Sequence, residues 1–189
     1  SAVSGGALYR RASFLLDQAG QQLFPSWFAI AEEPHLLRGL GSCSFDSEGV
    51  ATSANHLVRD GVLQRYVMGS YSARKLGLTS TANAGGTHNL RVASNAGTLE
   101  QIMRSMGRGL LVTELMGQGV NIVTGDYSRG AAGFWIENGE PAYAVEEITI
   151  AGKLREMLVG IAAIGSEVDR RSSILTGPIL IDRMTIAGA

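Results

Sequence analysis

Residues 109–152 read GLLVTELMGQGVNIVTGDYSRGAAGFWIENGEPAYAVEEITIAG, and this stretch decides the predicted fold. Three segments in it are rich in β-branched, aliphatic or aromatic side chains, or alternate between apolar and polar ones: 110–116, 132–137 and 145–150. Such runs between glycines are typical of β-strands. Asn138-Gly139 joins the last two runs, and this dipeptide tolerates the positive φ angles of a tight hairpin turn. The sequence therefore predicts antiparallel strand pairing here.

A short polar segment precedes the second of these predicted strands. Glycines at 125 and 130 flank it, and its side chains are an acid, a phenol, a hydroxyl and a guanidinium: Asp126, Tyr127, Ser128 and Arg129. Side chains in such a position are the least expected in a core, and binding residues are often carried on loops. We therefore predict an exposed loop at 125–130 whose four polar residues are candidate substrate contacts.

Composition places the chain among ordinary globular domains. Of its 189 residues, 45% are hydrophobic and 17% are charged, and the formal net charge is −1. This balance lacks the basic footprint of nucleic-acid-binding proteins, so direct nucleic-acid binding is not expected. No apolar run reaches the length that spans a bilayer, and the start has no signal-peptide pattern. The single cysteine, Cys43, is compatible with a reducing compartment, and we predict a cytoplasmic protein without a membrane association.

Elsewhere the pattern predicts a further hairpin and short helices. Asp60-Gly61 lies between two apolar runs and predicts a second hairpin turn. Four segments have helical spacing or capping signals: 10–22, 70–76, 98–106 and 153–164. The first of these is weak because glycine and proline interrupt it. We predict an α+β fold that is predominantly antiparallel β, a barrel-like or strongly curved sheet with two or three short helices packed on it, in a single domain over 1–189.

A second candidate binding segment surrounds a pair of glycines. Gly85 and Gly86 are followed by Asn89 and Arg91, which carry hydrogen-bond donors. Such a segment would suit the main chain of an extended peptide that binds by strand addition. The alternative, that the glycines only permit a turn, is equally compatible with the sequence.

The residues offer little for catalysis by this chain alone. A zinc hydrolase needs three protein ligands, two of them usually a turn apart on a helix, but His35, His56 and His88 are widely separated and no HExxH or HExxxH pattern occurs. Asp46 and Glu48 are either an acid pair or a turn in which the aspartate caps the backbone, and the second reading is favoured.

Several blocks of the sequence resemble one known family. They are SGGALYRRASFLLD at 4–17, FDSEGV at 45–50, DGVLQRYVMGSYSARKLG at 60–77, GGTHN at 85–89, GDYSRGAAGFWIENGE at 125–140 and EEITIAG at 146–152. Together they are similar to the carboxy-terminal half of the TldD/PmbA proteins, the "modulator of DNA gyrase" family, and specifically to its PmbA/TldE branch. The resemblance covers nearly the whole chain.

The resemblance implies a subunit of a cytoplasmic heterodimeric zinc metallopeptidase that cleaves unfolded or leader peptides. In the TldD branch an HExxxH helix and a late cysteine hold zinc. The matching positions here fall near Ala2 for the second histidine and near Ser172 or Ser173 for the cysteine, and neither suits zinc. The chain is therefore expected to hold no cofactor, to contribute chamber and substrate contacts, and to pair with a TldD-like subunit that carries the zinc; a homodimer is an alternative assembly.

Two other functions fit the residues. One is a non-catalytic interaction module that modulates gyrase or a toxin–antitoxin pair. The other is an independent hydrolase centred on Asp46, Glu48 or Cys43, which predicts activity without any partner.

Overall fold

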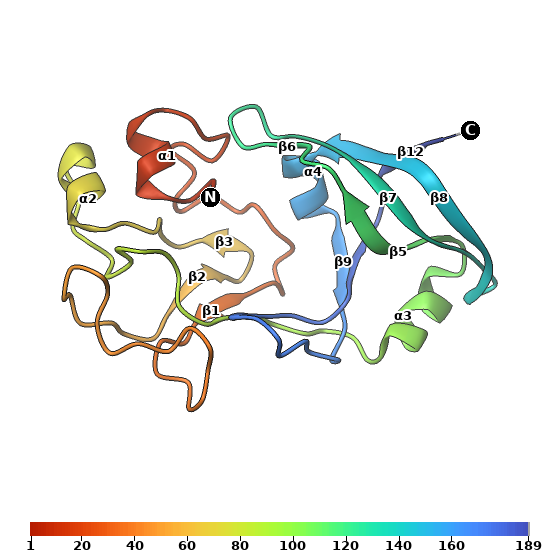
Figure 1. The fold of residues 1–189 in the computed structure, drawn as a ribbon, viewed down its shortest axis with the longest axis horizontal. Coiled ribbons are helices and arrows are strands. Elements are labelled where there is room, and N and C mark those ends of the chain that lie inside the picture. Colours follow the sequence, from red (N-terminus) through yellow and green to blue (C-terminus); the bar gives the residue numbers. More distant parts are fainter. Residues whose placement is uncertain (189) are drawn as a thin grey trace. The chain divides into compact units, whose positions relative to one another are not determined.

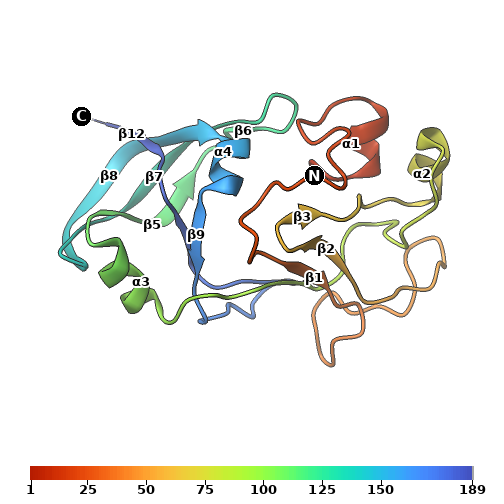
Figure 2. The same ribbon diagram turned by 180° about the vertical axis from the view of Figure 1, so that it is seen from behind.

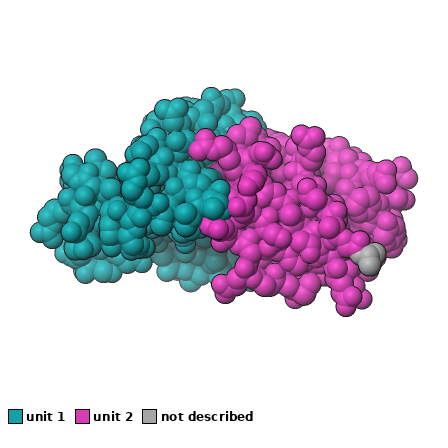
Figure 3. All heavy atoms as spheres, turned by 90° about the horizontal axis from the view of Figure 1, so that it is seen from above, with its two compact units in different colours: residues 1–93, 122–124, 168–176 teal, residues 94–121, 125–167, 177–189 magenta. Residues whose placement is uncertain are grey.

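The fold is that of a computed structural model, which describes residues 1–188. The chain divides into two compact units, coloured separately in Figure 3. Unit 1 comprises residues 1–93, 122–124 and 168–176, and unit 2 comprises residues 94–121, 125–167 and 177–189. That one domain spans the whole chain stays a prediction.

Unit 1 holds a sheet of short strands. Its elements are α1 (Gly5–Tyr9), β1 (Ile30–Glu32), β2 (Asn55–Arg59), β3 (Val62–Leu63), α2 (Ser70–Leu76), β4 (Leu90–Val92) and β10 (Ile174–Leu175). The strand order is β10-β4-β1-β2-β3, and only the β10–β4 pair is parallel. Figure 2 shows the β1, β2 and β3 strands of this sheet. Asp60 and Gly61, with φ angles of 52° and 75°, form the β2–β3 turn, so the predicted hairpin is confirmed.

Unit 2 is built on a long hairpin. Its elements are α3 (Leu99–Met106), β5 (Gly109–Met116), β6 (Val120–Asn121), β7 (Asp126–Glu137), β8 (Glu140–Lys153), α4 (Leu154–Val159), β9 (Ile161–Ile164), β11 (Ile179–Ile181) and β12 (Thr185–Ala187). The main sheet has the order β12-β8-β7-β5, and β6 also pairs with β7 (Figure 1). β9 and β11 form a separate antiparallel pair.

The β7–β8 turn has the predicted geometry. Asn138 and Gly139 both have positive φ angles, 53° and 80°, as a tight hairpin turn requires. A Cβ atom at 139 would lie only 2.7 Å from Cα of Arg104, so this position needs glycine for space as well as for conformation. In the two strands of the hairpin, Ala131, Ile148 and Ile150 form a buried cluster that Leu110 and Tyr127, among others, pack against.

The antiparallel α+β class is confirmed, but the barrel is wrong. Neither of the larger sheets closes on itself in the described chain, because the two end strands of each sheet do not pair with each other: β10 and β3 in unit 1, β12 and β5 in unit 2. The described residues contain four helices of five to eight residues, against the two or three short helices predicted for the fold.

Two predicted helices differ from the structure. Residues 10–22 form turns, since Arg11, Asp17 and Gly20 have positive φ angles that no helix contains. The helix expected at 153–164 ends at Val159, and Ile161–Ile164 becomes a strand because it pairs with β11. By contrast, α3 begins with the predicted capping box, in which Thr98 accepts from the Gln101 N–H and the Gln101 side chain accepts from the Thr98 N–H.

Candidate substrate-binding site

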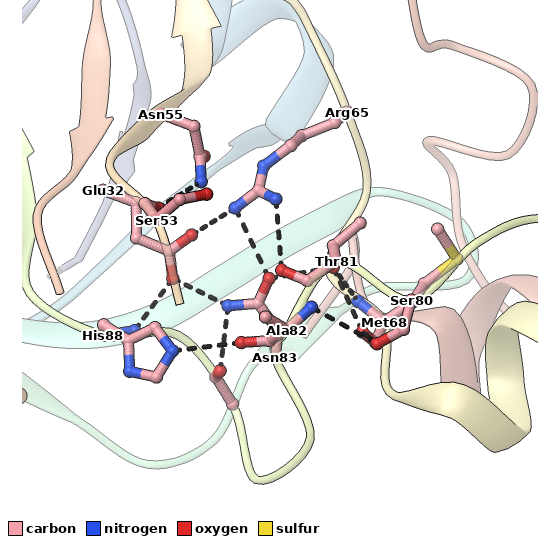
Figure 4. Close-up of polar contacts among 11 residues, drawn as sticks. Glu32, Ser53, Asn55, Arg65, Met68, Ser80, Thr81, Ala82, Asn83 and His88 are labelled. Carbon is pink, nitrogen blue, oxygen red and sulfur yellow. Dashed lines mark hydrogen bonds and ion pairs between the residues drawn. The ribbon is translucent and has the colours of Figure 1, made fainter. Parts of the chain in front are cut away.

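A buried carboxylate holds the segment that contains Gly85 and Gly86. Glu32, at the end of β1, is only 2% exposed. Its Oε1 atom accepts hydrogen bonds from Asn83 Nδ2 at 2.7 Å and from the His88 main-chain N–H at 2.9 Å (Figure 4). Its other oxygen forms an ion pair with Arg65. The two ends of the 83–88 loop are thus fixed to a single oxygen atom of the sheet.

Further polar contacts complete this network, as Figure 4 shows. Asn83 Nδ2 also donates to the Gly86 carbonyl at 3.2 Å, and Asn83 Oδ1 accepts from the Thr81 hydroxyl at 2.8 Å. His88 Nε2 lies 3.1 Å from the Ala82 carbonyl oxygen, which it meets as an N–H donor. Burial lowers the pKa of the Arg65 guanidinium, and the neighbouring Glu32 carboxylate partly offsets this effect.

A second buried carboxylate binds the same loop at Ala84. Asp46, 4% exposed, accepts from the N–H groups of Glu48 and Val50 at 2.9 and 3.0 Å and from that of Ala84 at 3.0 Å. Burial alone would raise the pKa of Asp46, but these three donors outweigh it and lower the pKa. The capping interpretation of this turn is therefore confirmed, and Asp46 is poorly suited to proton transfer.

The loop forms part of the wall of an open pocket of about 390 Å³. Gly85 and Gly86 line it, with φ angles of 98° and 126° that side-chain-bearing residues rarely adopt. Gly5, Gly6 and Gly69 line it as well. At the rim, the rings of Tyr9 and Tyr71 meet edge to face with centroids 5.9 Å apart. A glycine-rich wall allows the main chain of a ligand to approach closely.

Asn89 and Arg91 do not join this pocket. The Asn89 side chain is 1% exposed and is bound to the Glu33 carbonyl, the Ser42 hydroxyl and the Gly41 N–H, at 2.8 to 2.9 Å. A substrate contact by this side chain would require these bonds to break. Arg91 pairs with Glu33 at 2.9 Å. Strand addition along β4 is excluded, because β1 and β10 occupy both of its edges.

The predicted loop at 125–130 is wrong, because residues 126–130 begin strand β7. Asp126 forms an ion pair with Lys153, Tyr127 packs against the buried cluster, and Arg129 donates to the carbonyls of Leu115 and Gly117. Ser128 is exposed. Both edges of this part of β7 are paired, so strand addition is excluded here too. A direct contact of these four side chains with substrate stays a prediction.

A larger cavity of about 860 Å³ lies in unit 2, and the sequence reasoning missed it. It runs along residues 109–115 of β5 and is also lined by Ile102, Met103 and Met106 of α3 and by residues 178–184. The available signal was the amphipathic face of α3, which carries Leu99, Ile102, Met103 and Met106, but this pattern equally describes a core helix.

The three histidines and the cysteine have separate contacts and do not share a site. His35 Nε2 contacts the Thr52 hydroxyl at 3.0 Å, and His56 Nδ1 contacts Arg59 at 2.8 Å. The exposed Cys43 thiol donates to the Phe45 carbonyl. Within residues 1–188, no three His, Cys, Asp or Glu side chains are grouped as a metal site would require. None of the helices in the described part of the chain is long and apolar enough to cross a membrane.

Comparison with known proteins identifies relatives over the full chain. A family described as "PmbA/TldA metallopeptidase C-terminal domain" matches residues 1–188. The "Metalloprotease PmbA homolog" of Haemophilus influenzae is 58% identical over 189 residues, which are 100% of this chain and 42% of the relative.

Solved structures agree with this match. A Bacteroides thetaiotaomicron protein described as a "putative modulator of DNA gyrase" has a TM-score of 0.94 and 30% identity, with 100% of this chain and 43% of that chain covered. TldE from Thermococcus kodakarensis has a TM-score of 0.86 and 27% identity, with 99% and 46% covered. The chain spans less than half the length of these relatives. It belongs to the PmbA/TldD metallopeptidase family, in the region of the carboxy-terminal domain, as the sequence blocks predicted.

Proposed function

We propose that this chain belongs to a PmbA-like subunit of a TldD/PmbA zinc metallopeptidase, that a TldD-like subunit supplies the zinc, and that this chain binds the unfolded or leader peptide substrate. The family supports the reaction class. The partner is supported by organisms that have both branches: Haemophilus influenzae has a "Metalloprotease PmbA homolog" and a "Metalloprotease TldD homolog", the latter 24% identical to this chain over 173 residues.

The observation that carries peptide binding is the unpaired edge of β5. This strand of eight residues pairs with β7 on one side, and no described strand pairs with its other edge. The main-chain groups of an edge strand are available to an added strand. Main-chain hydrogen bonding of this kind is independent of side chains, and it suits unfolded peptides of varied sequence.

The cavity beside this edge supports the same role. Its other walls are mainly apolar and rich in methionine, with Met103, Met106, Met157 and Met184 among the lining residues. Unbranched thioether side chains adapt to different apolar groups. An extended peptide on the β5 edge would direct alternate side chains toward opposite faces of the sheet, and one set would enter this cavity. We propose the Gly85–Gly86 pocket of unit 1 as a second contact for substrate main chain.

The test is hydrolysis of an unstructured peptide that carries a fluorophore and a quencher. The full-length protein is assayed alone and mixed with its HExxxH-bearing relative, with and without a zinc chelator. We expect cleavage only in the mixture, abolished by the chelator. Activity of this protein alone would overturn the proposal in favour of a hydrolase at Asp46, Glu48 or Cys43, and no activity in either sample would favour the interaction module.

The β5 edge has a matched control variant. Leu115 on β5 is 42% exposed and lines the cavity, whereas Phe134 on the interior strand β7 is 41% exposed and does not line it. A lysine at an edge strand opposes the addition of an apolar strand. We expect Leu115→Lys to raise KM about tenfold, the equivalent of roughly 1.4 kcal/mol of lost binding, while Phe134→Lys leaves KM near the wild-type value. Equal effects of the two variants would exclude the β5 edge.

A further inference from the structure

The conformation of the Gly85–Gly86 wall depends on contacts that lie behind it. Glu32 Oε1 receives the Asn83 side chain and the His88 N–H, which are the two ends of the loop. Glu32 belongs to β1, which is paired with β2 on one side and β4 on the other, so the position of this oxygen is fixed by the sheet.

Asn83 links Glu32 to the glycine pair by hydrogen bonds. Its Nδ2 atom donates both to Glu32 and to the Gly86 carbonyl, and the Gly86 N–H donates to the Asn83 carbonyl at 3.0 Å. Within residues 1–188, the main-chain N–H and C=O of Gly85 form no hydrogen bond, although Gly85 lines the pocket. The contacts behind the loop therefore leave the Gly85 main chain available to a ligand.

We propose that Glu32 is a positioning residue for peptide binding: through Asn83 and the His88 N–H it holds the Gly85–Gly86 main chain in the conformation that receives substrate main chain. This inference rests on the proposed function, in which the pocket contacts the peptide. Glu32 itself is buried behind the loop and touches no substrate.

The chemistry of burial supports a positioning role. A carboxylate that is 2% exposed is costly to bury, and an apolar side chain at the end of β1 would avoid this cost. A carboxylate does what an apolar group cannot, since one of its oxygens accepts from two loop donors while the other faces Arg65. Sheet packing alone does not require this arrangement.

The test separates loop position from stability. Asn83→Ala removes the link between Glu32 and Gly86. Glu32→Gln keeps an oxygen for the two loop donors and removes the charge that Arg65 faces; the amide oxygen turns toward the loop, because two donors lie there. Val58→Ala, in β2, is a control that weakens the same unit without contact to the loop, since Val58 is buried and pairs with Ile30 and Leu63.

Binding of a fluorescent unstructured peptide to each full-length variant is measured by anisotropy, together with Tm and, in the mixture with the zinc subunit, KM and kcat. We expect Asn83→Ala to raise Kd and KM about tenfold with kcat within about twofold, as the loss of roughly one hydrogen-bond contribution predicts. Glu32→Gln and Val58→Ala should lower Tm and leave Kd within about twofold.

Unchanged Kd in Asn83→Ala, or an equal increase in Val58→Ala, would overturn the positioning role. An inactive wild-type mixture in which Asn83→Ala still weakens peptide binding would overturn the proposed function and support the positioning role.

Discussion

The two units bury different kinds of side chain. All buried polar side chains of the described chain lie in unit 1: Ser13, Glu32, Asp46, Thr52, Asn83 and Asn89. The longest strand of unit 1 has five residues, whereas β7 and β8 of unit 2 have 12 and 14. Long strands satisfy main-chain groups by repetition, but the loops that join short strands need side chains for the same purpose.

This difference indicates which substitutions should destabilise each unit most. In unit 1, each of two buried carboxylates accepts from several donors. Asp46 accepts from three main-chain N–H groups, and Glu32 accepts from the Asn83 side chain and the His88 N–H and pairs with Arg65. Loss of either carboxylate therefore leaves several donors unpaired. In unit 2, the ladder between β7 and β8 tolerates the loss of a side chain's polar atoms, and the cost of a substitution comes from apolar packing. The following substitutions test this contrast.

The largest effect is expected for Glu32→Ala. It leaves Arg65 without its ion-pair partner and removes the acceptor for Asn83 and His88, so the free energy of unfolding should fall by about 3–5 kcal/mol. Urea denaturation measures this change. The neighbouring pair provides the control: Glu33 and Arg91 are 31% and 42% exposed in their side chains, and Glu33→Ala should cost less than about 1 kcal/mol. Similar losses for the two variants would contradict the contrast between buried and exposed carboxylates.

A somewhat smaller loss is expected for Ile136→Ala in β7. Ile136 is 0% exposed, and its truncation leaves a cavity that should cost about 2–4 kcal/mol. Ile186→Ala in β12, where the side chain is 44% exposed, should cost less than about 1 kcal/mol. Hydrogen exchange followed by mass spectrometry should locate the faster exchange of Ile136→Ala in residues 126–153. Equally faster exchange in unit 1 would show that the units do not respond separately.

Much of unit 2 could be predicted because its signals are local. The Asn138-Gly139 turn, the Thr98 capping box and the β5 strand each depend on residues within a few positions of one another. Strand β7 was predicted to begin too late, because polar residues and glycines at 125–130 hide a strand whose partners, Met116 and Thr149, are distant in sequence.

The site was predictable only in part. The glycine pair at 85–86 was interpreted either as a peptide contact or as a turn, and the positive φ angles and the bond from the Gly86 N–H to the Asn83 carbonyl show that it forms a turn. The sequence around Glu32 does not indicate its role in the site, because its partners Arg65, Asn83 and His88 lie 33, 51 and 56 positions away. Asn89 was read as an available donor, since its burial against residues 33–42 depends on the same long-range folding.

The smallest effect is a pH dependence that should be confined to unit 1. Burial opposes the ionisation of Asp46, but the Ala84, Val50 and Glu48 N–H groups outweigh it, so its pKa in the folded state lies below the ordinary value of 3.8. A lowered folded-state pKa means that Asp46 stabilises the fold fully above pH 3.8 and that this stabilisation is lost as the pH falls through the lower folded-state pKa.

Asp46→Asn tests this dependence because asparagine keeps one acceptor oxygen for the turn and does not titrate. Between about pH 6 and about pH 3, the wild-type urea midpoint should fall more than that of the variant. Exchange measured at the lower pH should quicken in residues 46–50 and 84, while the β7–β8 ladder, which the Asp46 carboxylate does not contact, keeps its protection. Two outcomes would contradict this contrast between the units. In one, the β7–β8 ladder loses protection at the same pH as the 46–50 turn. In the other, Asp46→Asn keeps the full pH dependence of the wild-type protein.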